Sequence, residues 1–314
     1  MSSRIIQTVL PFLTFILLAV LSFFAPIEQT NGEWIPIIGG FGNTEVLDNL
    51  FVSVPLLVLL AAVIFTGVYF FILRVNSISF LHVITLFLLL IAANPYSMRL
   101  NAVYPAIACI IWFKFCLFNS EVFVGYLLLS AASLFYAPII WLIPSSVMIL
   151  PLNGMPDPWR TSVKALSGSL LPHIYVLVFR WIKFDDAEEY LYYFTQQATD
   201  ISLPFSNLGI PDYFLLLVIL YIVIKALSYF SLKSPKGFVE YILKSEIFMM
   251  IISFLLYLLF AGNEQVTLLS ITLMSVSVIF AYYFKNCEKV SRTNMEFLML
   301  LCALVLCSVS HIMN

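Results

Sequence analysis

Four carboxylates lie in one polar interval, residues 26–50, which separates two long apolar segments of the chain. They are Glu28, Glu33, Glu45 and Asp48. A carboxylate beside a membrane-embedded cavity can act as a general base on an acceptor hydroxyl, so these residues are the candidate catalytic bases. The competing interpretation is that each acid is simply a solvated loop residue.

Arg99 lies in the polar turn that follows the third apolar segment. A guanidinium can hold two oxygens of a phosphate or pyrophosphate at once, so Arg99 is a candidate substrate-binding residue. The alternative is an arginine that anchors the turn at the membrane surface.

His173 follows Pro172 inside an apolar segment and is the second candidate substrate-binding residue. A histidine within a membrane can contact a proton or a polar solute, or it can be a hydrogen-bonded residue at a proline kink. Lys114 and Lys225 are expected to snorkel toward the cytoplasmic surface. His82 is expected to be structural. With so few ionisable groups in apolar segments, a proton-driven pump is poorly supported.

Motifs for other chemistry are missing from the sequence. There is no HExxH zinc motif, no GxxxxGK[ST] phosphate loop and no GxSxG nucleophile motif. We therefore expect no metal site, no cofactor and no ATP-driven activity within this chain. The five cysteines lack paired close spacing and are expected to be small packing residues.

Composition defines the class of protein that must position these residues. Of the 314 residues, 62% are hydrophobic and only 10% are charged, with a mean hydropathy of +1.03. Soluble domains carry about 25% charged residues, so the sequence predicts an integral membrane protein surrounded by lipid. The net charge of −2 indicates no nucleic-acid partner.

Apolar segments recur along the whole chain and predict an all-α, polytopic transmembrane bundle that forms a single domain, residues 1–314. We expect about eleven spans, within a range of nine to twelve. They are residues 5–25, 51–73, 78–94, 101–118, 121–137, 138–152, 165–182, 212–231, 246–262, 265–284 and 294–312. Residues 121–152 could instead form one long span and a re-entrant piece. Segment 5–25 is expected to be kept as an anchor, because Phe23 and Pro26 do not suit a signal-peptide cleavage site.

Basic residues predict the orientation of the bundle. A cytoplasmic N-terminus places Arg99, Arg180 and Lys183 outside. The basic residues that it places inside are Arg4, Arg74, Arg160, Lys164, Lys233, Lys236, Lys244, Lys285, Lys289 and Arg292. The inner side therefore carries the excess, as cytoplasmic loops do.

Two loops on the predicted outer side, residues 26–50 and 183–212, are long enough to contain structure. In the second loop, Phe184, Ala187, Leu191 and Phe194 fall at helical spacing. The neighbouring acids lie off this apolar stripe and several tyrosines are close by, so the pattern predicts a helix in the outer headgroup layer.

Residues 94–150 are the most interrupted part of the apolar sequence. Breaks are expected at Asn119-Ser120-Glu121 and at Pro138 and Pro144. Small side chains alternate with bulky ones and predict close helix contacts. They are Gly125, Ala131, Ala132 and Ser133.

Within this block, NAVYPAIACIIWFKF (101–115) and VGYLLLSAASLFYAPIIWLIP (124–144) resemble a region of the C-type glycosyltransferases. The resemblance implies a glycosyltransferase-like core over residues 1–215, followed by additional spans over 212–314. It implies juxtamembrane helices in both long outer loops. It also implies a polyprenyl-phosphate-linked sugar as substrate, a first-loop acid as base and Arg99 as phosphate contact. Unlike most members, the chain shows no clear acidic pair after its first span and no acid beside Arg99.

The same block also resembles an uncharacterised family of bacterial polytopic membrane proteins of similar length, which implies the inner membrane of a bacterium and no particular activity. Two functional hypotheses follow. The favoured one, based on the scarcity of polar groups, is a non-enzymatic subunit of a membrane assembly, with protein partners, or a transporter. The alternative is a glycosyltransferase-like enzyme acting on a lipid-linked sugar at the outer face.

Overall fold

A computed structural model describes residues 103–148, 157–201, 209–233, 237–260, 265–287 and 290–313, together with Val83, Leu86 and Leu90. The elements are α5 (Val103–Phe118), α6 (Val122–Phe135), η2 (Ala137–Trp141), α7 (Leu142–Val147), α8 (Pro158–Phe184), α9 (Ala187–Thr199), α10 (Ile210–Leu232), α11 (Phe238–Phe260), α12 (Gln265–Asn286) and α13 (Val290–Met313). Every regular element in these ranges is a helix. The all-α prediction is therefore confirmed for the described part of the chain.

Four helices in the described ranges are long and apolar enough to cross a membrane. They are Trp159–Phe184, Ile210–Leu232, Val239–Phe260 and Thr293–Ser310. Each overlaps a predicted span, and together they make the chain a polytopic helical membrane protein. The predicted spans 5–25 and 51–73 lie outside the described residues. The total of eleven spans and the orientation therefore stay predictions.

The helix α8 shows how the sequence matches a bilayer. Trp159 and Trp181 are 80% and 65% exposed near its two ends. At 1.5 Å per residue they are about 33 Å apart, close to the thickness of a hydrocarbon core. Tryptophans prefer the membrane–water interface, so this spacing marks both surfaces on one helix.

Residues 121–147 form three short helices instead of one long span. The helix α6 has 14 residues and is about 21 Å long, too short to cross a bilayer unaided. Its end at Phe135 is followed by extended Tyr136 and by the 3-10 helix η2, which begins just before Pro138. The breaks predicted at Asn119-Ser120 and at Pro138 are confirmed, whereas Pro144 lies within α7.

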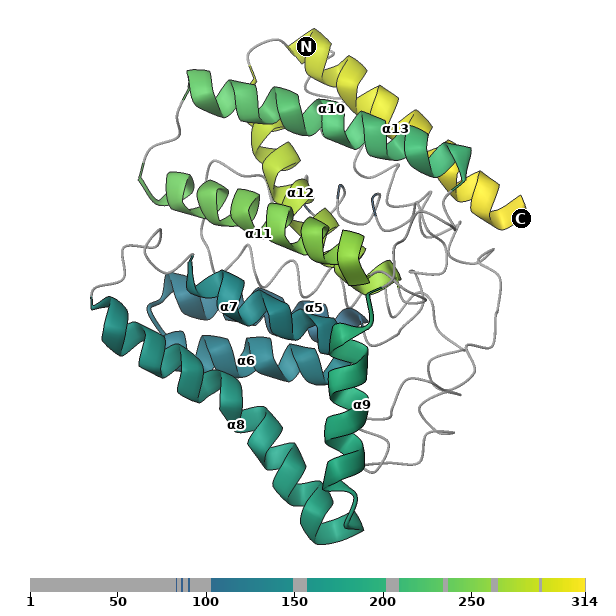
Figure 1. The fold of residues 1–314 in the computed structure, drawn as a ribbon. Coiled ribbons are helices and arrows are strands. Elements are labelled where there is room, and N and C mark those ends of the chain that lie inside the picture. The colour runs from purple at the N-terminus through teal and green to yellow at the C-terminus, as the bar shows by residue number, and fades with distance from the viewer. Residues whose placement is uncertain are drawn as a thin grey trace.

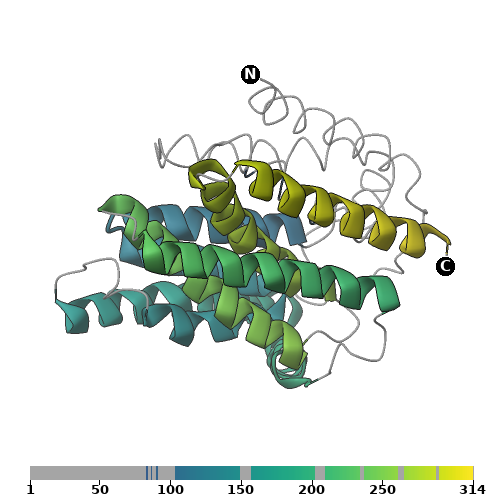
Figure 2. The same cartoon turned by 90° about the horizontal axis from the view of Figure 1, so that it is seen from above.

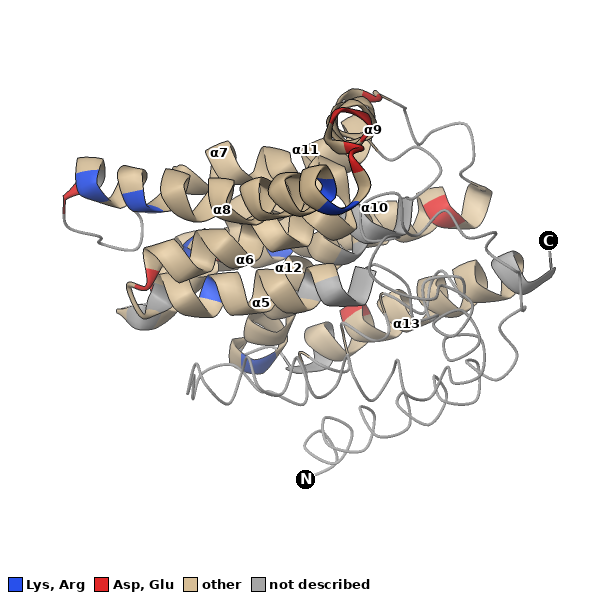
Figure 3. Ribbon diagram, turned by 90° about the horizontal axis from the view of Figure 1, so that it is seen from below, with Lys and Arg blue, Asp and Glu red and all other residues tan. Residues whose placement is uncertain are grey.

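Figure 1 shows that α5, α6, α10 and α11 run in similar directions, whereas α9 crosses steeply beside their ends. The helix α9 is accordingly seen almost end-on in Figures 2 and 3. A helix that crosses α10 and α11 steeply lies along the membrane surface when these two helices span the bilayer. This arrangement agrees with the surface helix predicted for the loop after α8.

The face of α9 that packs on the bundle differs from the predicted stripe. Tyr190, Phe194 and Ala198 are buried, whereas Leu191 is exposed. Of the predicted stripe, Phe194 lies on this packing face, whereas Phe184 and Leu191 are exposed. The side of α9 that packs on η2 and α8 also includes the aromatic ring of Tyr190.

The most buried helix is α12, in which every residue from 271 to 284 is buried. It contacts α5, α10 and α11. Its hydroxyl side chains are accommodated by hydrogen bonds, as with Ser277, which donates to the carbonyl of Met274 at 2.6 Å. A helix that is apolar on all sides is expected at the centre of a membrane bundle.

Small residues let α6 and α8 approach closely, as their pattern predicted. The hydroxyl of Ser130 donates to the carbonyl of Ser169 at 2.5 Å, and a methyl group added at Gly168 would clash with the carbonyl oxygen of Phe123. Gly125 similarly packs on Cys116 of α5. Tight packing of this kind replaces the hydrophobic driving force that is missing between helices in lipid.

Replacing Gly168 by alanine should destabilise the bundle by about 1–3 kcal/mol, because the new methyl group meets backbone that cannot move aside cheaply. Unfolding of the purified protein in detergent would measure the change. The matched control is Ser167→Ala on the exposed side of the same turn, which should change stability by less than about 0.5 kcal/mol. Equal effects of the two variants would contradict the packing argument.

Candidate functional site

The predicted catalytic bases Glu28, Glu33, Glu45 and Asp48, and the predicted phosphate contact Arg99, lie outside the described residues. Whether they line one cavity therefore stays a prediction. The described part of the chain contains two other polar sites inside the bundle. One is centred on Lys114 and the other on His173.

Lys114 forms a buried ion pair that joins three helices. Its Nζ lies 2.6 Å from Oε2 of Glu246 and 3.3 Å from the hydroxyl of Ser275. The two charged side chains are 2% and 0% exposed. The pair therefore connects α5, α11 and α12 at a place without contact with solvent or lipid.

The expectation that Lys114 snorkels to the surface was wrong. An ion taken out of water loses several kcal/mol of hydration, and only a close opposite charge repays this cost. Glu246 provides that charge, because α11 begins at Phe238 and carries Glu246 about 12 Å into the helix. The span had been predicted to begin at residue 246, which would have left the carboxylate at the surface.

The faces of α11 contain a signal that could have located the site. Glu240 and Lys244 form an exposed ion pair one turn apart. Ile242, Leu243 and Glu246 are buried. Glu246 lies four residues after Ile242 and three after Leu243, so it belongs to the buried face of an amphipathic helix start. Hydropathy averaged over a window hides such a residue.

A second polar contact joins α11 to α12. Thr272 donates to Ser253 at 3.0 Å, and Ser253 donates in turn to the carbonyl of Met249 at 2.6 Å. Thr272 and Ser275 thus give the buried face of α12 two hydroxyls that form hydrogen bonds with neighbouring helices.

The second site surrounds His173, beside Pro172 in α8. Its Nε2 lies 3.0 Å from the hydroxyl of Ser133 in α6, and its Nδ1 lies 3.2 Å from the hydroxyl of Tyr190 in α9. The ring of Phe194 packs edge-on against the imidazole. The histidine thus connects three helices, and its role as a substrate-binding residue stays a prediction.

The hydrogen bonds assign one tautomer. The hydroxyl of Ser133 donates its hydrogen to the carbonyl of Ser130 at 2.6 Å. Ser133 can then only accept from His173, so Nε2 carries the hydrogen and Nδ1 accepts from Tyr190. Both ring nitrogens of His173 are satisfied when the imidazole is neutral.

An ion pair holds the corner between α8 and α9. Arg180 contacts both carboxylate oxygens of Asp186, with Nε 3.0 Å from Oδ1, and its guanidinium lies 5.8 Å from the centre of the Tyr190 ring. The bond from Arg180 lowers the pKa of the Asp186 carboxyl, so the pair stays charged well into the acid range. Burial raises the pKa of Tyr190 to about 12, although Arg180 partly offsets this effect, so the phenol keeps its proton.

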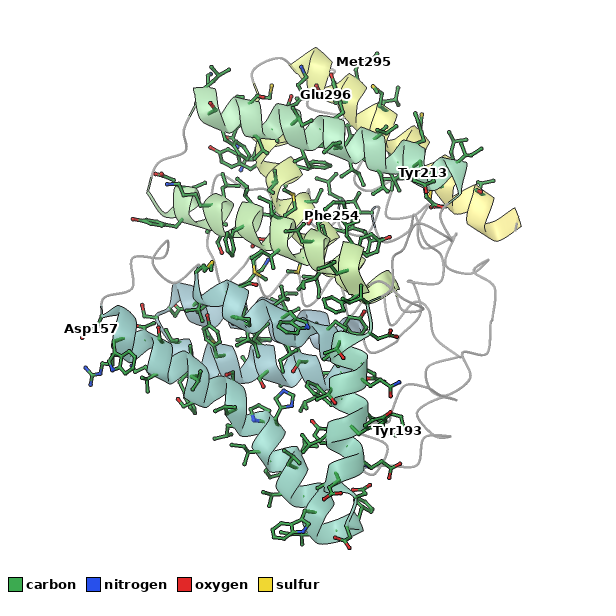
Figure 4. The ribbon with its side chains drawn as sticks, in the orientation of Figure 1. Asp157, Tyr193, Tyr213, Phe254, Met295 and Glu296 are labelled. Carbon is green, nitrogen blue, oxygen red and sulfur yellow. The ribbon has the colours of Figure 1, made fainter. Side chains whose placement is uncertain are left out.

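Further ionisable groups lie between α10, α12 and α13. Glu296 is buried near the start of α13, where Figure 4 labels it, and accepts from the hydroxyl of Tyr283 at 2.9 Å. Near the other end of α13, Cys307 lies 3.0 Å from the carboxylate of Asp212, which is in the first turn of α10. With Lys114 and Glu246, the described bundle buries more ionisable groups than the sequence had indicated.

The structure also places the cysteines and Lys225. All five cysteines are free thiols. Lys225 is half-buried, with its Nζ 5.5 Å from the centre of the Tyr221 ring. Among the described residues, no group of three His, Cys, Asp or Glu side chains is placed to hold a metal ion.

The fold and the sites define a polytopic helical membrane protein with a charged pair inside its bundle. Figure 3 shows that charged residues otherwise gather near the ends of helices and along α9. Comparison with known proteins gives no match to a protein-family model, a curated protein or a solved structure.

Replacing Glu246 by glutamine should destabilise the protein by about 3–5 kcal/mol, because it leaves the Lys114 charge buried without a counter-ion. The double variant Lys114→Met with Glu246→Leu should recover most of this loss. Denaturation of the purified protein in mixed detergent micelles would measure both.

The matched control is Glu240→Gln, which breaks the exposed pair with Lys244 on the same helix and should cost less than about 1 kcal/mol. A Glu246→Gln variant as stable as this control would show that the buried ion pair does not have the predicted energetic weight.

Proposed function

We propose that the chain is a membrane transporter and that the Lys114–Glu246 pair is its charged binding site. The observation that carries the proposal is the 2.6 Å ion pair between side chains that are 2% and 0% exposed. Ionisable residues inside a membrane are costly and commonly line pathways for ions or solutes. The inner membrane of a bacterium is the proposed location.

Energetics favour this role over that of a passive subunit. Apolar side chains of similar volume often hold a bundle as well as a buried ion pair does, or better. A protein that only has to pack therefore gains little from Lys114 and Glu246. A transporter gains a pair of charges that can be separated and re-formed.

The charge balance of the site indicates the class of solute. A proton bound to Oε2 of Glu246 neutralises the carboxylate and leaves the Lys114 ammonium without a counter-charge. A solute anion can restore neutrality by accepting from Nζ of Lys114, beside Ser275. Proton and anion then bind together, because either one alone leaves an uncompensated charge in the bundle.

Proteoliposomes containing a pH-sensitive dye test this proposal. Membrane-impermeant anions, namely glutamate, citrate, gluconate and phosphate, are added outside in turn, and the internal pH is followed. We expect at least one anion to acidify the lumen with the wild-type protein. Glu246→Gln and Lys114→Gln should abolish the signal.

The control for transport is Glu240→Gln, whose exposed carboxylate is outside the site and whose signal should match the wild type. Transport by Glu246→Gln at the wild-type rate would overturn the role of the pair. If none of the anions acidifies the lumen more than in protein-free liposomes, the proposed solute class is wrong.

A second candidate function is the transfer of a lipid-linked sugar at the outer face. The observation that favours it is the surface helix α9 directly after α8, where the resemblance to C-type glycosyltransferases predicts a juxtamembrane helix. In this case the base would be one of the first-loop acids, and Arg99 would contact the phosphate of the lipid carrier.

Combined replacement of Glu28 and Glu33 by glutamine should abolish sugar transfer to an acceptor if one of these two acids is the catalytic base. Radiolabelled polyprenyl-phosphate sugar incubated with membranes of matched expression level would measure transfer. Unchanged transfer would remove the role of Glu28 and Glu33, and no transfer by the wild type would remove the function.

A further inference from the structure

We infer that His173 is a proton-binding site that controls the docking of α9 on the bundle. The inference does not depend on the proposed transport function. It rests on the hydrogen bonds that connect His173 to Ser133 of α6 and to Tyr190 of α9.

The docking of α9 depends on a small number of contacts. Tyr190, Phe194 and Ala198 form its buried face. Trp141 of η2 donates through Nε1 to the carbonyl of Ala198 at 2.8 Å, near the far end of the helix. At the near end, the hydroxyl of Tyr190 donates to His173. The opposite side of α9 is exposed, and Figure 4 shows Tyr193 pointing away from the bundle.

Protonation of His173 can occur only at Nδ1, because Nε2 already carries a hydrogen. The new N–H then faces the hydrogen that Tyr190 donates. Tyr190 cannot resolve the conflict by losing its own proton, since that group titrates near pH 12. The Tyr190 hydroxyl must then turn its hydrogen away and accept from Nδ1, so this buried O–H gives up its bond to His173. The imidazolium is also placed against the apolar ring of Phe194. The docked arrangement therefore favours neutral His173 over an imidazolium.

The charges around His173 do not compensate an imidazolium. From α8, the nearest cation is Arg180, whose guanidinium lies over the same Tyr190 ring. Asp186, just before α9, is already paired with Arg180. Glu189, in the first turn of α9, is exposed. The residues that α6 supplies here are the neutral hydroxyls of Ser130 and Ser133. A proton on His173 therefore favours release of Tyr190 to a more hydrated position.

The direction of the pH effect follows from this geometry. The docked state prefers neutral His173, so its stabilising bonds are present at neutral pH and are lost on acidification. An unconstrained histidine titrates near pH 6.5, so the loss begins below about that value. The Arg180–Asp186 pair is still charged in this range, because the pKa of Asp186 is lowered.

Hydrogen exchange of the full-length protein in lipid nanodiscs, followed by mass spectrometry at pH 7.5 and 5.5, tests the inference. After correction for the intrinsic rate, the amides of residues 187–199 should exchange about tenfold faster at pH 5.5 than at pH 7.5. This factor is expected because pH 5.5 lies about one unit below the ordinary pKa of histidine, and each unit changes the equilibrium tenfold. Residues 271–284 of buried α12 should show no such change.

Variants separate His173 from other groups. His173→Gln should remove the pH dependence, and Tyr193→Phe, on the exposed side of α9, should keep it. Tyr190→Phe should speed exchange at pH 7.5 and reduce the pH effect, which gives a second readout if the glutamine variant does not fold. A wild-type protein without the acid effect, or a His173→Gln or Tyr190→Phe variant that retains all of it, would overturn the inference.

Discussion

The cost of removing a charge from water is the constraint that organises the described bundle. Lys114 and Glu246 are almost completely buried, so their 2.6 Å contact must be maintained wherever α5, α11 and α12 lie. Lipid provides no alternative partner for either group. The pair therefore helps to fix the relative position of three helices, together with the hydrogen bond from Thr272 to Ser253 and with apolar packing.

Polar backbone groups at the ends of helices also need hydrogen-bond partners inside the bundle. Side chains of the interrupted segment around η2 provide such partners. The hydroxyl of Tyr136 donates to the carbonyl of Phe260 at the end of α11, at 2.9 Å. The indole of Trp141 donates to Ala198 near the end of α9. Helix ends leave carbonyls without intrahelical partners. The breaks in residues 121–147 thus place side chains where α9 and α11 need donors.

Hydropathy predicted the long apolar helices, because both the interior of the bundle and the surrounding lipid favour apolar side chains. The apolar segments of α10 and α13 were predicted to within two residues at each end, because any long apolar helix meets the requirement of the bilayer. The segment of α8 was predicted to begin at residue 165 and instead begins at Trp159. Glu246 and the buried face of α9 were misjudged, because a partner far away in sequence decides their environment. Lys114 is 132 positions away from Glu246, and no local pattern links them. His173 was recognised from its own rarity, yet its partners Ser133 and Tyr190 are ordinary in sequence.

The two polar sites of the described bundle differ in how they respond to a proton. In the Lys114 site, two opposite charges stabilise each other, and neutralising either one leaves the other buried without a counter-charge. In the His173 site, the imidazole is neutral and its hydrogen bonds are already complete, so a proton disrupts a satisfied arrangement without breaking an ion pair. The core site therefore depends on keeping two charges together, whereas the docking of α9 depends on keeping one ring neutral. This difference follows from the chemistry of the two sites and does not require any contact between them.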